Sequence, residues 1–117
     1  MPEDPLRPEQ CAEKLRALGD PTRLRIVGAL RSGRRNVGDL AGALGLEMVT
    51  VSHHLRILYQ AGLVTRAKAG RFVYYAVPAE VLHPGAPETT RDHLDLGCCR
   101  IELPGPGPGG APGPPDE

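Results

Sequence analysis

The feature that most constrains this chain is an amphipathic segment at residues 46–62, with the sequence LEMVTVSHHLRILYQAG. Its apolar residues Val51, Leu55 and Leu58 recur at i, i+4 and i+7, which is the spacing of one face of a helix. Gly62 ends the periodic pattern, and the next residues favour a strand. The sequence therefore predicts a helix that buries one side in a core and leaves the other side free.

The free side of this helix differs from an ordinary solvated helix surface, which mixes Glu and Lys. It carries short hydrogen-bonding side chains and one long cation, with no acidic group beside them. Such groups suit contact with base edges and phosphates in a groove of DNA. We expect His53 to face DNA and His54 to face the neighbouring helix, although a structural role for either stays open. The candidate DNA-binding residues of the helix are Thr50, Ser52, His53 and Arg56.

Two further helices are predicted ahead of this segment. Asp20 and Pro21 mark a helix start, because the Asp side chain accepts from free backbone amides and Pro at the first position has no amide to leave unpaired. This helix ends at residues 32–33. A short helix over residues 36–44, joined to the central helix by a turn at Gly45, makes a helix-turn-helix.

Basic residues gather in two places. Near the end of the helix that starts at Pro21, three arginines either form a solvated helix end or contact phosphate; they are Arg31, Arg34 and Arg35. Residues 63–77 predict a two-stranded β-hairpin around an Ala-Gly turn. Its predicted inward or cross-strand positions are Val64, Phe72, Tyr74 and Val77. A basic hairpin directly after a helix-turn-helix is typical of a wing that contacts DNA, here through Arg66, Lys68 and Arg71.

Length and composition predict one small domain of α+β, mainly helical class: a winged helix-turn-helix with a two-stranded wing. We divide the chain into a flexible arm (1–8), the winged helix-turn-helix (9–83), a C-terminal segment with a cysteine pair (84–103) and a disordered Pro/Gly-rich tail (104–117). Residues 1–83 carry a net charge of +4 and residues 84–117 a net charge of −4, so the basic part is the one suited to phosphate. The chain has neither a membrane-length apolar run nor a signal-like start, so we expect a cytoplasmic protein.

Three cysteines in a reducing compartment are expected as thiols or thiolates rather than as a disulfide framework. Cys11 lies on the apolar side of a predicted helix over residues 9–18 and is either a core residue or a ligand. Cys98 and Cys99 are adjacent, so regular structure would separate their sulfurs unless Gly97 allows an irregular backbone. No Cys-x-x-Cys or ordered Cys-His pair is present, which argues against a thiol enzyme.

Four segments taken together resemble the ArsR/SmtB family of bacterial winged-helix repressors. They are LRALGDPTRLRIVGAL at 15–30, DLAGALGL at 39–46, TVSHHLRILYQAGLV at 50–64 and GRFVYYAV at 70–77. The resemblance implies a homodimer that binds double-stranded palindromic operator DNA as a repressor, and that is released by a metal, a metalloid or a sulfur species. Met48 and Val49 depart from the pattern, because many relatives carry polar DNA-contacting residues there.

The inducer-binding residues cannot be carried over in the same way. The cysteine pair of the best-known arsenic sensors is replaced by Asn-Val-Gly-Asp at residues 36–39. The family's zinc sensors use a final helix, for which this chain offers only a thin ligand set: Asp92, His93 and Asp95. Three cysteines remain, and three soft thiolates match the trigonal sulfur site that As(III) or Sb(III) prefers. The candidate metal ligands are Cys11, Cys98 and Cys99.

Several alternatives stay open on the sequence. One alternative to As(III) or Sb(III) is another thiophilic metal as the inducer, such as Cd, Pb or Zn. A second is that the cysteines bind no metal and instead sense an oxidant or a persulfide. A winged helix used only to bind protein is a further alternative. The pattern in residues 88–103 fits either a helix or a strand interrupted by a one-residue slip.

Overall fold

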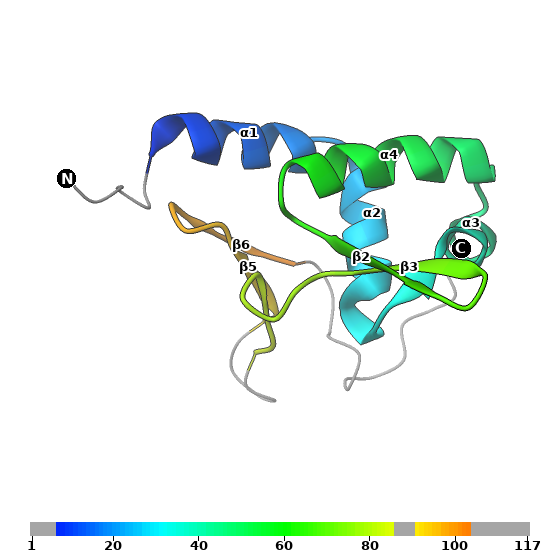
Figure 1. The fold of residues 1–117 in the computed structure, drawn as a ribbon. Coiled ribbons are helices and arrows are strands. Elements are labelled where there is room, and N and C mark those ends of the chain that lie inside the picture. Colours follow the sequence, from blue (N-terminus) through cyan, green and yellow to red (C-terminus); the bar gives the residue numbers. More distant parts are fainter. Residues whose placement is uncertain (1–6, 86–90, 104–117) are drawn as a thin grey trace.

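The computed structural model of the chain describes residues 7–85 and 91–103. These ranges contain four α-helices and two small antiparallel sheets, so the predicted α+β, mainly helical class is confirmed (Figure 1). Most of the predicted arm and the whole predicted tail at 104–117 lie outside the described residues, although Pro8 already belongs to the first helix. The elements in chain order are α1 (Pro8–Leu18), α2 (Pro21–Ala29), the 3-10 turn η1 (Leu30–Ser32), β1 (Arg35–Asn36), α3 (Val37–Leu44), α4 (Met48–Gln60), β2 (Thr65–Ala69), β3 (Phe72–Ala76), β4 (Leu82–His83), β5 (His93–Asp95) and β6 (Arg100–Glu102).

The helix boundaries follow from local side-chain and backbone chemistry. Asp20 accepts a hydrogen bond from the backbone N–H of Arg23 at 3.1 Å, which confirms the predicted start of α2. Asn36 caps α3 in the same way, through the backbone N–H of Asp39 at 2.7 Å. Gly45 then adopts φ +69°, a left-handed conformation that turns the chain directly into α4. The predicted helix-turn-helix of α3 and α4 is therefore present.

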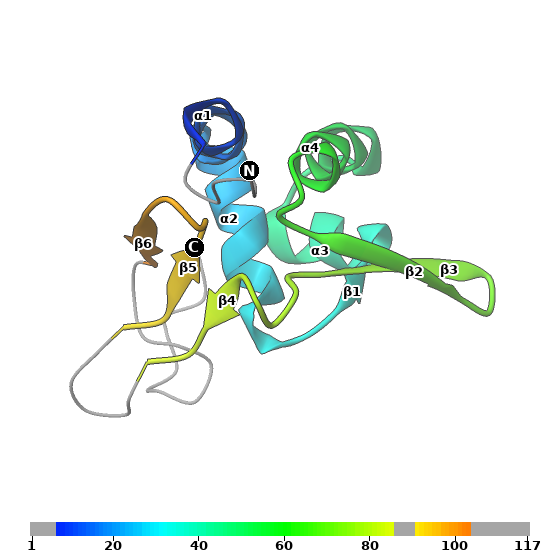
Figure 2. The ribbon, with the colours of Figure 1, turned by 60° about the vertical axis from the view of Figure 1, so that its left-hand side comes forward.

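The packing of α1, α2 and α4 sets the body of the molecule. α1 and α4 are both seen nearly end-on in Figure 2, and they run side by side with α2 crossing beneath them. Their shared core is aliphatic, as the low aromatic content predicts. On α4 the three residues predicted to face inward have no exposed surface: Val51, Leu55 and Leu58.

The wing is a three-stranded sheet in the order β1-β3-β2. Its hairpin closes at Ala69 and Phe72 around Gly70, whose φ is +64°, so the predicted two-stranded hairpin is confirmed. The third strand, β1, was not predicted; it pairs with β3 at Tyr74 and Tyr75. Phe72 was predicted to be an inward or a cross-strand position; it is cross-strand, opposite Ala69, and not inward, since it is 45% exposed. The hairpin extends beyond the helices into solvent, so its tip has no core to enter (Figure 2).

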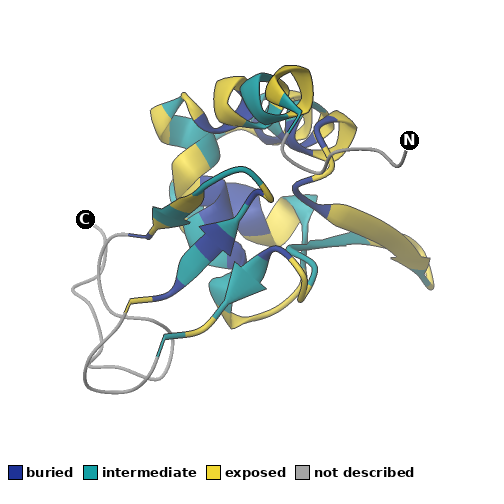
Figure 3. Cartoon of the chain, turned by 90° about the vertical axis from the view of Figure 1, so that its left-hand side faces the viewer, coloured by how far each residue is buried: buried dark blue, intermediate teal, exposed yellow. Residues whose placement is uncertain are grey.

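The described residues 91–103 of the C-terminal segment form strands and no helix. They differ from the predicted strand with a one-residue slip, because two short strands are joined here by a turn. β4, β5 and β6 make a second antiparallel sheet with Leu82, Leu94 and Ile101 in register. Leu94 and Leu103 are each 1% exposed and belong to the same core as the helices. Figure 3 shows the buried residues gathered where this sheet meets the helices, and the exposed residues running out along the wing.

None of the helices in the described part of the chain is both long enough and apolar enough to cross a membrane.

Candidate DNA-binding surface and thiol site

The outer side of α4 is the first candidate site. Ser52, His53 and Arg56 are exposed, and Thr50 is half-buried. Because the inward residues of the helix are buried in the core, the rotation of the helix about its axis is fixed, and the opposite face points to solvent. α4 and the wing lie on the same side of the molecule, away from the second sheet (Figure 2). Three of the four residues predicted from the sequence, Ser52, His53 and Arg56, are thus exposed on this helix, whereas Thr50 is partly covered.

His54 lies on the inner flank of the same helix. Its Nδ1 is 3.1 Å from Nη1 of Arg23 on α2 and 4.0 Å from a carboxylate oxygen of Asp20. The prediction that His54 faces the neighbouring helix is confirmed. The backbone N–H of Arg23 holds the pKa of Asp20 below its usual value, and the charge of Arg23 acts in the same direction. These three residues fasten α4 to the start of α2 and so fix the outer face of α4.

The wing presents the three predicted cations in exposed positions: Arg66, Lys68 and Arg71. The guanidinium of Arg66 lies 4.4 Å from the centroid of the Tyr59 ring at the end of α4. Arg34 lies in the same way over Tyr74 of β3, at 4.3 Å. A stacked guanidinium keeps its N–H groups at the ring edge free to donate, so these contacts orient the cations without neutralising them.

Arg31 has a different role from the phosphate contact or solvated helix end considered above. Its Nε and Nη2 donate to Oδ2 of Asp92 at 3.1 and 2.9 Å. The backbone N–H of Gly85 donates to the other oxygen of Asp92 at 3.0 Å. The Gly85 amide and the Arg31 guanidinium lower the pKa of Asp92, although burial opposes them. Both oxygens of Asp92 are therefore used in a buried ion pair and a backbone hydrogen bond. Of the three weak candidates for a zinc site, only His93 and Asp95 remain.

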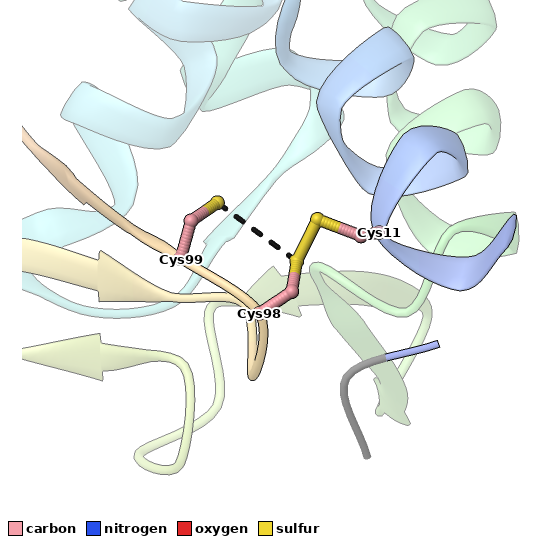
Figure 4. Close-up of side chains that lie close together, drawn as sticks. All are labelled: Cys11, Cys98 and Cys99. Carbon is pink, nitrogen blue, oxygen red and sulfur yellow. Dashed lines mark hydrogen bonds between the residues drawn. A yellow bond between two sulfur atoms is a disulfide. The ribbon is translucent and has the colours of Figure 1, made fainter. Parts of the chain in front are cut away.

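The second candidate site is formed by the cysteines (Figure 4). Cys11 comes from α1, and Cys98 and Cys99 come from the turn between β5 and β6. The three sulfur atoms all lie within 4.8 Å of one another. Gly97 adopts φ +91°, which confirms that the backbone is irregular where the adjacent cysteines need it to be. The cysteines are half-buried, at the edge of the core rather than inside it.

The oxidation state of this group differs from the prediction of three free thiols. Cys11 and Cys98 are joined in a disulfide that links positions 87 residues apart, and Cys99 is free. The Cys99 sulfur lies 3.9 Å from the Cys98 sulfur. When the disulfide is reduced, the donor set is three sulfurs in one group, which fits a soft three-coordinate ion.

The turn that carries the cysteine pair is held from both sides. The backbone N–H of Gly97 donates to a carboxylate oxygen of Asp95 at 2.9 Å, and this contact lowers the pKa of Asp95. The backbone N–H of Leu96 donates to the carbonyl of Cys99 at 3.0 Å. Sequence reasoning placed the cysteine pair but missed the Arg31–Asp92 pair, because no local pattern links residues 61 positions apart.

Comparisons with known proteins agree with this geometry. Residues 20–66, from the start of α2 to the start of the wing, match the family described as bacterial regulatory protein, arsR family. The chain is 47% identical over 68 residues to the HTH-type transcriptional regulator NmtR of Mycobacterium tuberculosis, covering 58% of this chain and 57% of NmtR. It is 37% identical over 67 residues to the transcriptional repressor SdpR of Bacillus subtilis, covering 57% of this chain and 74% of SdpR.

A solved structure extends the likeness to the fold. It is the homodimeric winged helix-turn-helix DNA-binding domain of a possible ArsR-family transcriptional regulator from Mycobacterium bovis. The TM-score is 0.58 at 35% sequence identity, and the match covers 59% of this chain and 64% of that one. The family consists of DNA-binding transcription regulators, not enzymes. With α2 to the wing matched in sequence and the winged helix matched in structure, the chain belongs to the ArsR family of bacterial regulatory proteins.

Proposed function

We propose that the chain is a cytoplasmic transcriptional repressor that binds palindromic operator DNA as a homodimer and is released by As(III) or Sb(III) bound to Cys11, Cys98 and Cys99. The observation that carries the inducer part is the convergence of three sulfurs within 4.8 Å. Within the described ranges this group consists of sulfur donors alone, and soft ligands favour a thiophilic ion over a hard cation.

The binding step needs no change in the oxidation state of arsenic. Once a thiol reductant has opened the Cys11–Cys98 disulfide, three thiols meet one molecule of arsenious acid. Three arsenic–sulfur bonds form and three arsenic–oxygen bonds break, and each thiol proton leaves with a hydroxide as water. The product is a neutral trithiolate, which suits the half-buried edge of an aliphatic core.

The DNA-binding part is supported by the outward polar side of α4 and the basic wing beside it. In a dimeric helix-turn-helix protein, two such helices enter major grooves about one helical turn, roughly 34 Å, apart. The related domain from Mycobacterium bovis is a homodimer. Leu15 on α1 is 43% exposed, and it offers apolar surface for a second copy of the chain.

Release follows from where the sulfurs are attached. Cys11 belongs to α1, which packs against both α2 and α4. An ion that binds Cys11 to the turn between β5 and β6 constrains α1, and with it the position of α4 in a dimer. Coupling between sites of this kind is typically about 1 to 3 kcal/mol, which corresponds to roughly 5- to 150-fold in DNA affinity.

The test is a titration of the reduced, full-length protein on a fluorescent fragment of its own promoter. Arsenite should weaken binding in the wild type and have no effect in Cys11→Ser and Cys98→Ser, both of which should still bind DNA. Ala12→Ser, next to Cys11 on the half-buried side of α1, is the matched control and should respond like the wild type. Unchanged affinity with arsenite under full reduction contradicts the metalloid proposal.

A second candidate keeps the repressor and changes the signal. The Cys11–Cys98 disulfide favours oxidant sensing, in which two thiols lose two protons and two electrons and a peroxide is reduced to two waters. If peroxide or polysulfide abolishes DNA binding while arsenite, Cd, Pb and Zn do not, the cysteines are redox sensors. A response to Cd, Pb or Zn alone instead identifies another thiophilic metal as the inducer.

A further inference from the structure

The first turn of α4 exposes two apolar side chains that the core does not use. Met48 is 57% exposed and Val49 is 72% exposed, the largest value among the exposed large apolar residues of the described part of the chain. Val51, two positions further on, has no exposed surface. The core therefore uses Val51 and leaves more than half of the surface of both Met48 and Val49 exposed.

Helix propensity does not explain Val49. A β-branched valine loses rotamer freedom in a helix, so an exposed first turn is served better by Glu, Gln or Ala. Single apolar residues on a surface are ordinary, but here two are adjacent, and both lie in the first turn of the second helix of the helix-turn-helix. In a helix-turn-helix the N-terminal residues of the second helix are those that meet base edges.

The major groove contains one apolar group that such side chains recognise. Hydrogen-bonding side chains read donors and acceptors on the base edges, whereas the 5-methyl group of thymine is contacted by apolar atoms. On α4 the two types are separated along the helix. The apolar residues occupy the first turn, and Ser52, His53 and Arg56 follow them on the exposed side.

We propose that Met48 and Val49 contact thymine 5-methyl groups, so that the operator preference of this chain includes thymine at the positions met by the first turn of α4. The inference rests on the proposed function, because it requires α4 to lie in the major groove. It assigns specificity to two residues that contribute no hydrogen bond. Burying one methyl group between apolar atoms should change affinity by about fourfold per thymine.

The experiment first selects binding sites from a random DNA pool with the full-length reduced protein. Each thymine of the selected site is then replaced singly by deoxyuridine, which removes only the 5-methyl group, and the dissociation constants are measured by fluorescence anisotropy at one salt concentration. In the wild type, at least one thymine in each half-site should show a loss of about fourfold on replacement. In Val49→Ala or Met48→Ala, the same replacement should have no further effect.

Two more variants sharpen the result. Val49→Thr keeps the shape of the side chain and exchanges one methyl for a hydroxyl, so it should lose part of the discrimination without disturbing the helix. Val73→Ala, which removes an exposed valine from β3 of the wing, is the control and should keep the full uracil effect. Circular dichroism confirms that each variant is folded.

The outcomes separate the two proposals. If no DNA is selected at low salt, the proposed function fails and this inference fails with it. Should the protein select a site but bind its uracil and thymine forms equally, the repressor proposal stands and the methyl contact is refuted. A uracil effect of the same size in the wild type, Met48→Ala and Val49→Ala also refutes it, since the effect then comes from DNA shape.

Discussion

Replacing Asp92 by Ala is the most demanding test of how the C-terminal sheet is fixed to the helical body. Three N–H groups converge on the Asp92 carboxylate, two from Arg31 at 3.1 and 2.9 Å and one from Gly85 at 3.0 Å. The side chains of Arg31 and Asp92 are only 9% and 11% exposed. The substitution therefore takes away the hydrogen-bond acceptor of a buried guanidinium and of a backbone amide at the same time.

The size of the effect follows from the burial of the pair. Removing one partner of a buried ion pair costs about 3 to 5 kcal/mol, and the slight exposure of this pair places the expected cost near the lower end. A domain of this size has a free energy of unfolding of about 5 to 15 kcal/mol, so roughly 3 kcal/mol is a large share. The expected decrease in the melting temperature is roughly 12 to 24 °C.

The assay is urea and thermal unfolding followed by circular dichroism, at one fixed protein concentration because a dimer unfolds with concentration dependence. Glu80→Ala, which removes an exposed carboxylate, is the control and should change stability by less than about 0.5 kcal/mol. In the double variant Arg31→Met with Asp92→Leu, most of the stability should return, because an apolar pair leaves no buried charge. A decrease below about 1 kcal/mol in Asp92→Ala, or a double variant as unstable as the sum of its single variants, would refute the reasoning.

The same carboxylate has a defined pH signature. Its pKa is lower in the folded than in the unfolded chain, because the Gly85 amide and the Arg31 guanidinium stabilise the charged form. The stability it contributes is therefore fully present above the unfolded pKa, near 4, and is lost as the pH falls through the lower folded value. We expect the stability difference between wild type and Asp92→Asn to be constant from about pH 5 to 7 and to shrink below about pH 4, as measured by urea unfolding across that range. A difference that persists unchanged at pH 3 contradicts the assignment.

Three further results are expected. Asn36→Ala should lower the free energy of unfolding by about 1 kcal/mol in urea unfolding, because it removes the cap of α3; no change would mean that the cap contributes nothing. The combined Arg66→Ala, Lys68→Ala and Arg71→Ala variant should weaken binding to all duplex sequences and reduce the slope of log K against log salt by up to about 0.9 for each phosphate that the wing no longer neutralises, measured by anisotropy; an unchanged slope would remove the wing from the interface. Cys98→Ser should bind promoter DNA like the reduced wild type yet respond to neither arsenite nor peroxide, whereas a retained response to both would place the sensor elsewhere.

The helical part of the fold was predictable because its signals are local. Asp20 and Pro21 at the start of α2, and the inward spacing of Val51, Leu55 and Leu58 on α4, are each visible within one or two turns of sequence. The cysteine turn was half predictable in the same way. Two adjacent cysteines can bring their sulfurs to the same ligand only where the backbone is irregular. A glycine directly before them is a local signal for such a backbone.

What the sequence did not predict depends on partners far along the chain. β1 is only two residues long, and it is a strand because β3 lies beside it. Phe72 looks like a core residue by type, but it pairs with Ala69 at the closed end of the hairpin and is 45% exposed. The pairing of Arg31 with Asp92 likewise depends on the folded course of the chain between them, which no spacing encodes.

The β5–β6 segment has two attachments of different kinds, and their positions suggest how a signal would travel. Asp92, just before β5, is held by Arg31 in the 3-10 turn η1 that follows α2, whereas Cys98 in the turn after β5 meets Cys11 on α1. An ion bound by the cysteines would move α1 only if the other end of the segment resisted, and we propose that the buried Arg31–Asp92 pair supplies that resistance. Asp92→Ala should therefore reduce the effect of arsenite on DNA affinity more than it reduces arsenite binding itself. Equal decreases in the two would mean that the pair stabilises the fold without taking part in the coupling.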